Sequence, residues 1–148
     1  LTRFKQRVAE LTDRNQGRAL GEVIERLAPY LRGWRGYFGF CETPSVLRDL
    51  DSWIRHRLRS LVWKQWKRGR RRYAELVRRG VSRELAAQTA GSSHGPWRLA
   101  KSPALHIALS TAHFALSDYR DFMFHLPLNL PNRRVRTRTH GGVGGVEP

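Results

Sequence analysis

A run of apolar residues at helical spacing between positions 44 and 67 constrains the fold of this chain most strongly. Thr43 and Pro44 open the run, and an N-cap threonine followed by proline at the first helical position is a typical helix start. The apolar positions that follow near one face are Val46, Leu47, Leu50, Trp53, Ile54, Leu58, Leu61 and Val62. We predict one long helix over residues 44–67, whose apolar face must be buried against other elements.

Two shorter segments with the same periodicity precede the long one. Residues 2–13 predict an amphipathic helix that Asn15-Gln16-Gly17 ends, with Gly17 as a candidate left-handed residue. Residues 20–38 predict a second helix, in which Pro29 removes a backbone hydrogen bond and is expected to introduce a kink. The three segments can share one core, so we predict an all-α fold: a small helical bundle built around one long helix.

The rest of the chain shows shorter helical patterns and then none. Short helices are predicted over residues 73–79, 83–89 and 103–114, with a loop over residues 92–95. Ser102 and Pro103 repeat the combination of N-cap and proline. Beyond Phe122 the prolines and a glycine-rich run indicate a disordered tail. We divide the chain into a helical bundle (1–68), a basic helical extension (69–122) and a tail (123–148).

The charge of the chain points to a polyanionic partner. The formal net charge is +16, and 24 of the 28 basic residues are arginine. Such a charge opposes compaction unless a polyanion neutralises it, and the planar guanidinium suits phosphate because it donates two parallel hydrogen bonds. We therefore expect nucleic acid as the partner. A membrane surface is not expected, since no long stretch is apolar on one side and basic on the other.

The strongest candidate contact is the basic run over residues 64–72, which holds six cations and no acid. Trp63 and Trp66 lie within or beside it, and each could stack on a base or point into the core. Arg48, Arg55 and Arg59 are expected together on another face of the long helix, where a solvated charged face is an equal alternative. The predicted nucleic-acid contacts are Lys64, Lys67, Arg68, Arg70, Arg71, Arg72, Arg55, Arg59, Arg48, Arg98 and Lys101. Four arginines within residues 133–138 form a competing site.

No motif in the sequence predicts a catalytic or metal centre. Cys41 is alone, which excludes an internal disulfide and a cysteine-based zinc site. His106 and His113 are expected two turns apart on one helix, too far apart to share a metal ion. Asp118 and Asp121 flank a basic residue outside any strand pattern and do not form a two-metal site. We expect no enzyme activity, no cofactor and no metal.

The N-terminus has no apolar signal segment, and no apolar run approaches the length of a membrane span. A lone cysteine is compatible with a reducing compartment, and we expect a cytoplasmic location. The first residue is Leu1 rather than methionine, and we expect the chain to be the end of a longer protein.

Several motifs, in order, resemble the maturase-specific domain of group II intron reverse transcriptases. They are Leu31-Arg32-Gly33-Trp34-Arg35-Gly36-Tyr37-Phe38, Glu42-Thr43-Pro44-Ser45-Val46, Asp51-Ser52-Trp53-Ile54-Arg55, Trp63-Lys64-Gln65-Trp66-Lys67-Arg68, Gly95-Pro96-Trp97-Arg98-Leu99 and Lys101-Ser102-Pro103-Ala104-Leu105. The resemblance covers roughly residues 4–114. It implies the thumb, or X, domain, which follows the polymerase fingers and palm and helps the intron RNA to fold and splice.

The sequence also departs from that family. It contains neither the fingers and palm with their paired aspartates nor the zinc-containing endonuclease domain of some members. The resemblance therefore implies an RNA-binding domain that assists splicing of group II intron RNA without a catalytic centre of its own. Two alternatives stay open: a reverse-transcriptase thumb that holds a primer–template duplex beside a separate palm, and a general DNA-binding helical module.

Overall fold

The computed structural model of the chain describes residues 1–38 and 44–115. This part contains helices and no strand, which confirms the all-α prediction. The helices are α1 (Thr2–Leu11), α2 (Leu20–Phe38), α3 (Pro44–Gln65), α4 (Gly69–Arg78), α5 (Arg83–Ala90), α6 (Pro96–Leu99), α7 (Pro103–Ala108) and α8 (Thr111–Ala115). The predicted tail, the Thr43 cap, and Cys41, Asp118 and Asp121 lie outside the described residues.

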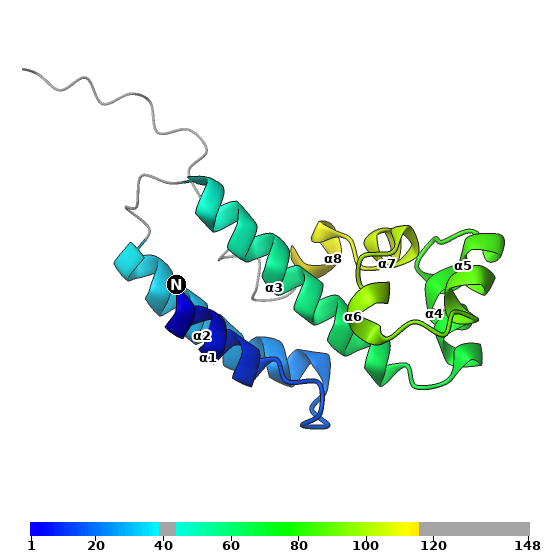
Figure 1. The fold of residues 1–148 in the computed structure, drawn as a ribbon, viewed down its shortest axis with the longest axis horizontal. Helices are drawn as coiled ribbons and strands as arrows, with labels where there is room; N and C mark the ends of the chain where they lie inside the picture. Colours follow the sequence, from blue (N-terminus) through cyan, green and yellow to red (C-terminus); the bar gives the residue numbers. More distant parts are fainter. Residues whose placement is uncertain (39–43, 116–148) are drawn as a thin grey trace, which may run out of the picture.

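The predicted long helix is confirmed as α3, which begins at Pro44 and ends two residues before the predicted boundary. Figure 1 shows α1 and α2 along one side of α3, and α4 to α8 gathered around its C-terminal half. Every residue from Leu58 to Trp63 is buried, so this stretch of α3 is covered all around. Because α3 lies at the centre, it holds the helices that pack around it in place.

Aromatic side chains fill both ends of the core. On one side, the Phe4 ring lies 5.7 Å from the Tyr30 ring and 4.4 Å from the Trp34 ring, measured between centroids, which joins α1 to α2. On the other, Trp63 is fully buried, and its ring centroid lies 5.9 Å from that of the buried Trp66. The two tryptophans of the basic run are therefore core residues, and the alternative that they stack on a base is wrong.

The helices after α3 differ from the sequence prediction in three ways. Helix α4 begins at Gly69, so the basic run forms its first turn, and α6 was not predicted. The single helix predicted over residues 103–114 is two helices, because Leu109 departs from helical geometry with φ −123° and ψ 60°. The carbonyl of Leu109 accepts a hydrogen bond from Arg59 Nε at 3.1 Å. A tertiary contact that local periodicity does not report occupies this break.

Two turn glycines have left-handed backbone geometry. Gly17 has the left-handed φ that the sequence predicted, +69°, and Gly80 has a φ of +87°; glycine reaches these values without steric cost. The Ser102 side chain accepts a hydrogen bond from the Leu105 amide at 3.4 Å, which confirms the predicted cap of α7. None of the helices in the described residues is long and apolar enough to span a bilayer.

Candidate nucleic-acid interface

Five of the predicted contacts gather at the junction of α3 and α4. Lys64, Lys67, Arg68, Arg70 and Arg71 are all exposed there. The chain turns tightly at this point, since Lys67 has a left-handed φ of +41° and the Arg68 amide donates to the Trp66 carbonyl at 2.5 Å. Arg68 then serves as the N-cap residue of α4. The turn therefore places the cations from the end of one helix and the start of the next on one exposed corner.

Arg72, the last cation of the run, has a different environment. Its guanidinium carbon lies 4.7 Å from the centroid of the buried Trp63 ring, a cation–π contact. Arg79, the C-cap residue of α4, lies 5.5 Å over Trp66 in the same way and pairs with Glu75 at 3.3 Å. These two arginines fasten α4 to the end of α3, so Arg72 is half-buried and structural in its contacts.

The prediction that Arg59 is an exposed contact is wrong, and Arg55, also predicted as a contact, already has partners within the protein. Arg59 is only 6% exposed, and its Nε bonds the Leu109 carbonyl, so it is not available to a phosphate at the surface. Arg55 pairs with the buried Asp51 at 2.5 Å and donates to Thr111 Oγ1 at 2.9 Å. Both side chains hold α8 and its preceding turn against α3.

The other predicted contacts are exposed but not close to the α3–α4 corner. Arg48 lies sixteen positions before Lys64 on the same helix, which corresponds to roughly 24 Å along the axis at ~1.5 Å per residue. Arg98 and Lys101 are exposed at α6 and directly after it. The predicted set therefore does not form one compact patch.

A first hollow, which we call the loop groove, lies beside the α3–α4 corner. It has a volume of about 450 Å³ and is lined by Arg14, Asn15, Gly17, Arg18, Ala19, Lys64, Gln65 and Lys67. Its lining holds four cations and no carboxylate. Lys64 Nζ hydrogen-bonds Asn15 Oδ1, and Gln65 Nε2 donates to the Arg18 carbonyl at 2.6 Å. These bonds fix the loop between α1 and α2 against the end of α3.

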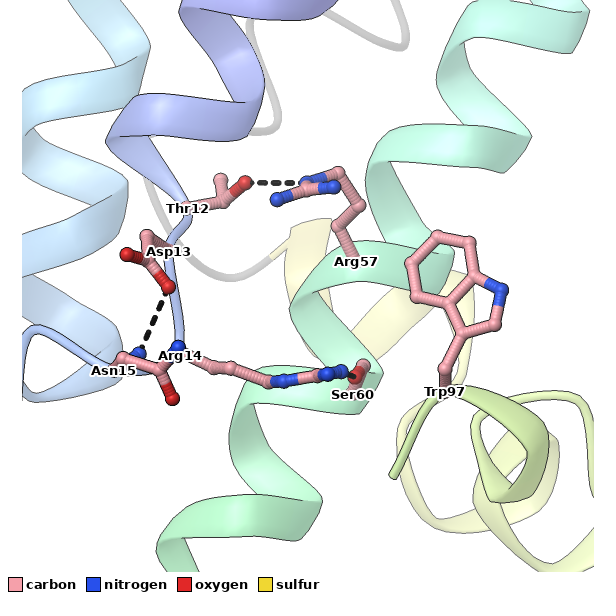
Figure 2. A pocket seen from close by; sticks show the side chains of 7 residues that line it. All are labelled: Thr12, Asp13, Arg14, Asn15, Arg57, Ser60 and Trp97. Carbon is pink, nitrogen blue, oxygen red and sulfur yellow. Dashed lines mark hydrogen bonds between the residues drawn. The ribbon is translucent and has the colours of Figure 1, made fainter. Parts of the chain in front are cut away.

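A second hollow, the central hollow, shares Arg14 and Asn15 with the loop groove. It has a volume of about 300 Å³, and its lining is completed by Thr12, Asp13, Arg57, Ser60 and Trp97. Figure 2 shows Arg14 reaching from the loop to Ser60 and Arg57 reaching from α3 to Thr12, at 3.1 and 2.7 Å. Burial, and next the nearby charge of Arg14, lower the pKa of Arg57. These two arginines thus join α3 to the end of α1 and to the loop that follows it.

A third hollow, the α6 hollow, shares Trp97 with the central hollow and has a volume of about 380 Å³. It is lined by Asp49, Ser52, Trp53, His56, Arg59, Trp97, Lys101 and His106. Burial lowers the pKa of His56 and of His106, so these imidazoles favour the neutral form. Because neighbouring hollows share lining residues, the three hollows adjoin one another between the α3–α4 corner and α6.

Sequence reasoning missed four residues that build this series: Arg14, Arg18, Arg57 and Trp97. Arg14 and Arg18 flank the Asn15-Gln16-Gly17 break, and two cations around a helix break were the available signal. Nothing local indicated that this break would face Lys64. Within the described residues, no group of three or more His, Cys, Asp or Glu side chains could hold a metal ion.

Comparison with known proteins agrees with the resemblance seen in the sequence. The family model of the group II intron maturase-specific domain matches residues 1–80, more than half of the chain. This range contains α1 to α4 and the whole loop groove, whereas α6 and Trp97 lie beyond it. Among curated proteins, no sequence matches significantly. The chain belongs to the family of group II intron maturase-specific domains.

Proposed function

We propose that this domain binds group II intron RNA and assists its folding and splicing through binding contacts alone. The observation that carries the proposal is the loop groove, where Arg14, Arg18, Lys64 and Lys67 line one hollow without a carboxylate. The groove lies within the part of the chain that matches the maturase-specific family. The splicing chemistry would belong to the RNA and its metal ions.

The arrangement suits a folded RNA because such an RNA crowds phosphates together. Cations on a rigid support can meet several phosphates without first losing side-chain and loop freedom. Here the support is the enclosed C-terminal half of α3, to which the loop is fastened by Lys64 and Gln65. Arg18 is partly engaged by Glu22 at 3.3 Å, an exposed pair that is worth little and can yield to a phosphate.

Competition binding by the full chain tests the proposal. A folded group II intron RNA is the labelled ligand, and RNA duplex, DNA duplex and an RNA/DNA hybrid are the competitors. We expect the intron RNA to be retained best, and log K to fall against log salt with a slope of roughly −4 to −5 if about six phosphates are engaged. Added protein should also increase the fraction of intron RNA spliced when magnesium is limiting.

The same experiment separates the alternatives. Equal competition by duplex DNA would contradict the proposal and favour a general DNA-binding module. Preferential competition by the RNA/DNA hybrid would favour a thumb that holds a primer–template duplex, and primer extension on mixing with a separate palm would then support that function. A salt slope near zero would show that the cationic hollows are not the binding site.

A further inference from the structure

We propose that Trp97 is a stacking platform for one unpaired base of the bound RNA, with the adjoining phosphates held by Arg14 and Arg57 on one side and Lys101 on the other. This inference rests on the proposed function and specifies a subsite for it. Trp97 and Lys101 lie outside the range matched by the family model, which ends at residue 80, whereas Arg14 and Arg57 lie inside it.

Trp97 is exposed and yet held in place. Trp97 is 41% exposed. Leu99 and Ala100, which follow shortly after it in the chain, are buried and anchor α6. Helix α6 packs on α3, and the His56 ring meets the indole edge to face, at 4.0 Å between centroids and 80° between planes. An indole fixed in this way presents aromatic surface to solvent and loses little freedom when a base stacks on it.

The charges around Trp97 favour a nucleotide over an apolar partner. The indole lines both the central and the α6 hollow. The first adds Arg14 and Arg57, and the second adds Lys101, whose side chain is exposed. One carboxylate lines each hollow, Asp13 and Asp49 respectively. Cations on two sides of an exposed indole match a strand whose phosphates flank a base.

The His56 imidazole, which contacts the Trp97 indole edge to face, is consistent with this arrangement. Burial lowers the pKa of His56, and the neighbouring charge of Lys101 lowers it further, against a hydrogen bond to the Trp97 backbone that raises it. His56 is therefore neutral at neutral pH and supports the ring through shape. Attraction of the phosphates then comes from Arg14, Arg57 and Lys101.

The test compares two oligonucleotides on the full wild-type chain: a single-stranded oligouridylate and an abasic strand of the same length and charge. Both offer the same phosphates, and only one offers bases. Base–aromatic stacking corresponds to roughly 5- to 140-fold in affinity, so we expect oligouridylate to bind tighter by a factor in this range. Trp97→Leu should remove this preference, and Trp97→Phe should keep most of it. Neither variant should change the salt slope, because no phosphate contact is lost.

Ile107→Ala is the matched control, since Ile107 is 50% exposed and lines none of the three hollows. It should bind both strands as the wild type does. Equal binding of abasic strand and oligouridylate by wild type, or an unchanged preference in Trp97→Leu, overturns the stacking platform. If folded intron RNA is still bound in that case, the proposed function stands without this subsite. If wild type binds no RNA at low salt, both proposals fail together.

Discussion

Neutralising the α3–α4 corner should weaken RNA binding in a way that net charge alone does not explain. The variant replaces Lys67, Arg68, Arg70 and Arg71 by glutamine, all four of them exposed. Arg72 stays, because its guanidinium covers the buried Trp63 ring at 4.7 Å and its loss would disturb the core. Exposed substitutions change the free energy of unfolding by about 0.5 kcal/mol or less each, so the fold should persist.

The magnitude follows from the number of phosphates released. Each lost phosphate contact makes the slope of log K against log salt shallower by about 0.9 for a duplex and about 0.7 for a single strand. If all four cations engage phosphates, the slope should become shallower by roughly three units. Fluorescence anisotropy of labelled intron RNA, titrated with protein at several salt concentrations, measures this slope directly.

A charge-matched control makes the result specific. Replacing Arg3, Arg26, Arg32 and Arg83 by glutamine also lowers the formal net charge from +16 to +12, because four positive charges are removed. These side chains are exposed and line none of the three hollows. We expect the control to keep a slope close to that of the wild type. Equal slopes for the two variants would refute the reasoning and leave only a diffuse effect of net charge.

Three further predictions concern stability and the competing site. Trp63→Ala should lower the free energy of unfolding by about 3–5 kcal/mol, measured by thermal or urea unfolding. Trp53→Ala should lower it less, because Trp53 is half-buried, with Arg57 5.3 Å from its ring centroid. Equal losses for the two variants would contradict the assigned burial. The pKa of His56 is lowered in the folded state, so the unfolded chain takes up the proton first and the melting temperature should fall as pH drops below 6.5. His56→Gln should flatten this pH dependence. A melting temperature that depends on pH as in the wild type would contradict the role given to His56. Replacing the four arginines within residues 133–138 by glutamine in the full chain should leave selective binding of intron RNA intact, and its loss would assign the contact to that segment.

The sequence predicted those features of the fold that depend on local signals. Helix α3 begins at Pro44 in the structure, as the sequence predicted, and Ser102 caps α7 as expected. The break at Leu109 could not be read from periodicity, because its carbonyl is bonded by Arg59 from another helix. The burial of Arg59 was missed for a related reason: α3 is covered on more than one side, so a residue away from the main apolar stripe is also enclosed.

The candidate site was predictable in charge and only partly in position. The exposed corner with Lys67, Arg70 and Arg71 was identified because six cations without an acid stand out in sequence. Arg14 and Arg18 join Lys64 through the path of the chain after α1, and this depends on the packing of α1 and α2 against α3. Long-range packing of this kind is decided by the whole core, which no local pattern reports.

Photo-crosslinking of the full chain to a folded group II intron RNA, followed by mass spectrometry of the adducts, tests the central claim most directly. The structure predicts crosslinks in residues 14–18 and 64–71, which form the loop groove and the adjoining corner, and at Trp97. Crosslinks confined to residues 133–138, or to the exposed face of α2, would show that the RNA lies elsewhere and would contradict the account.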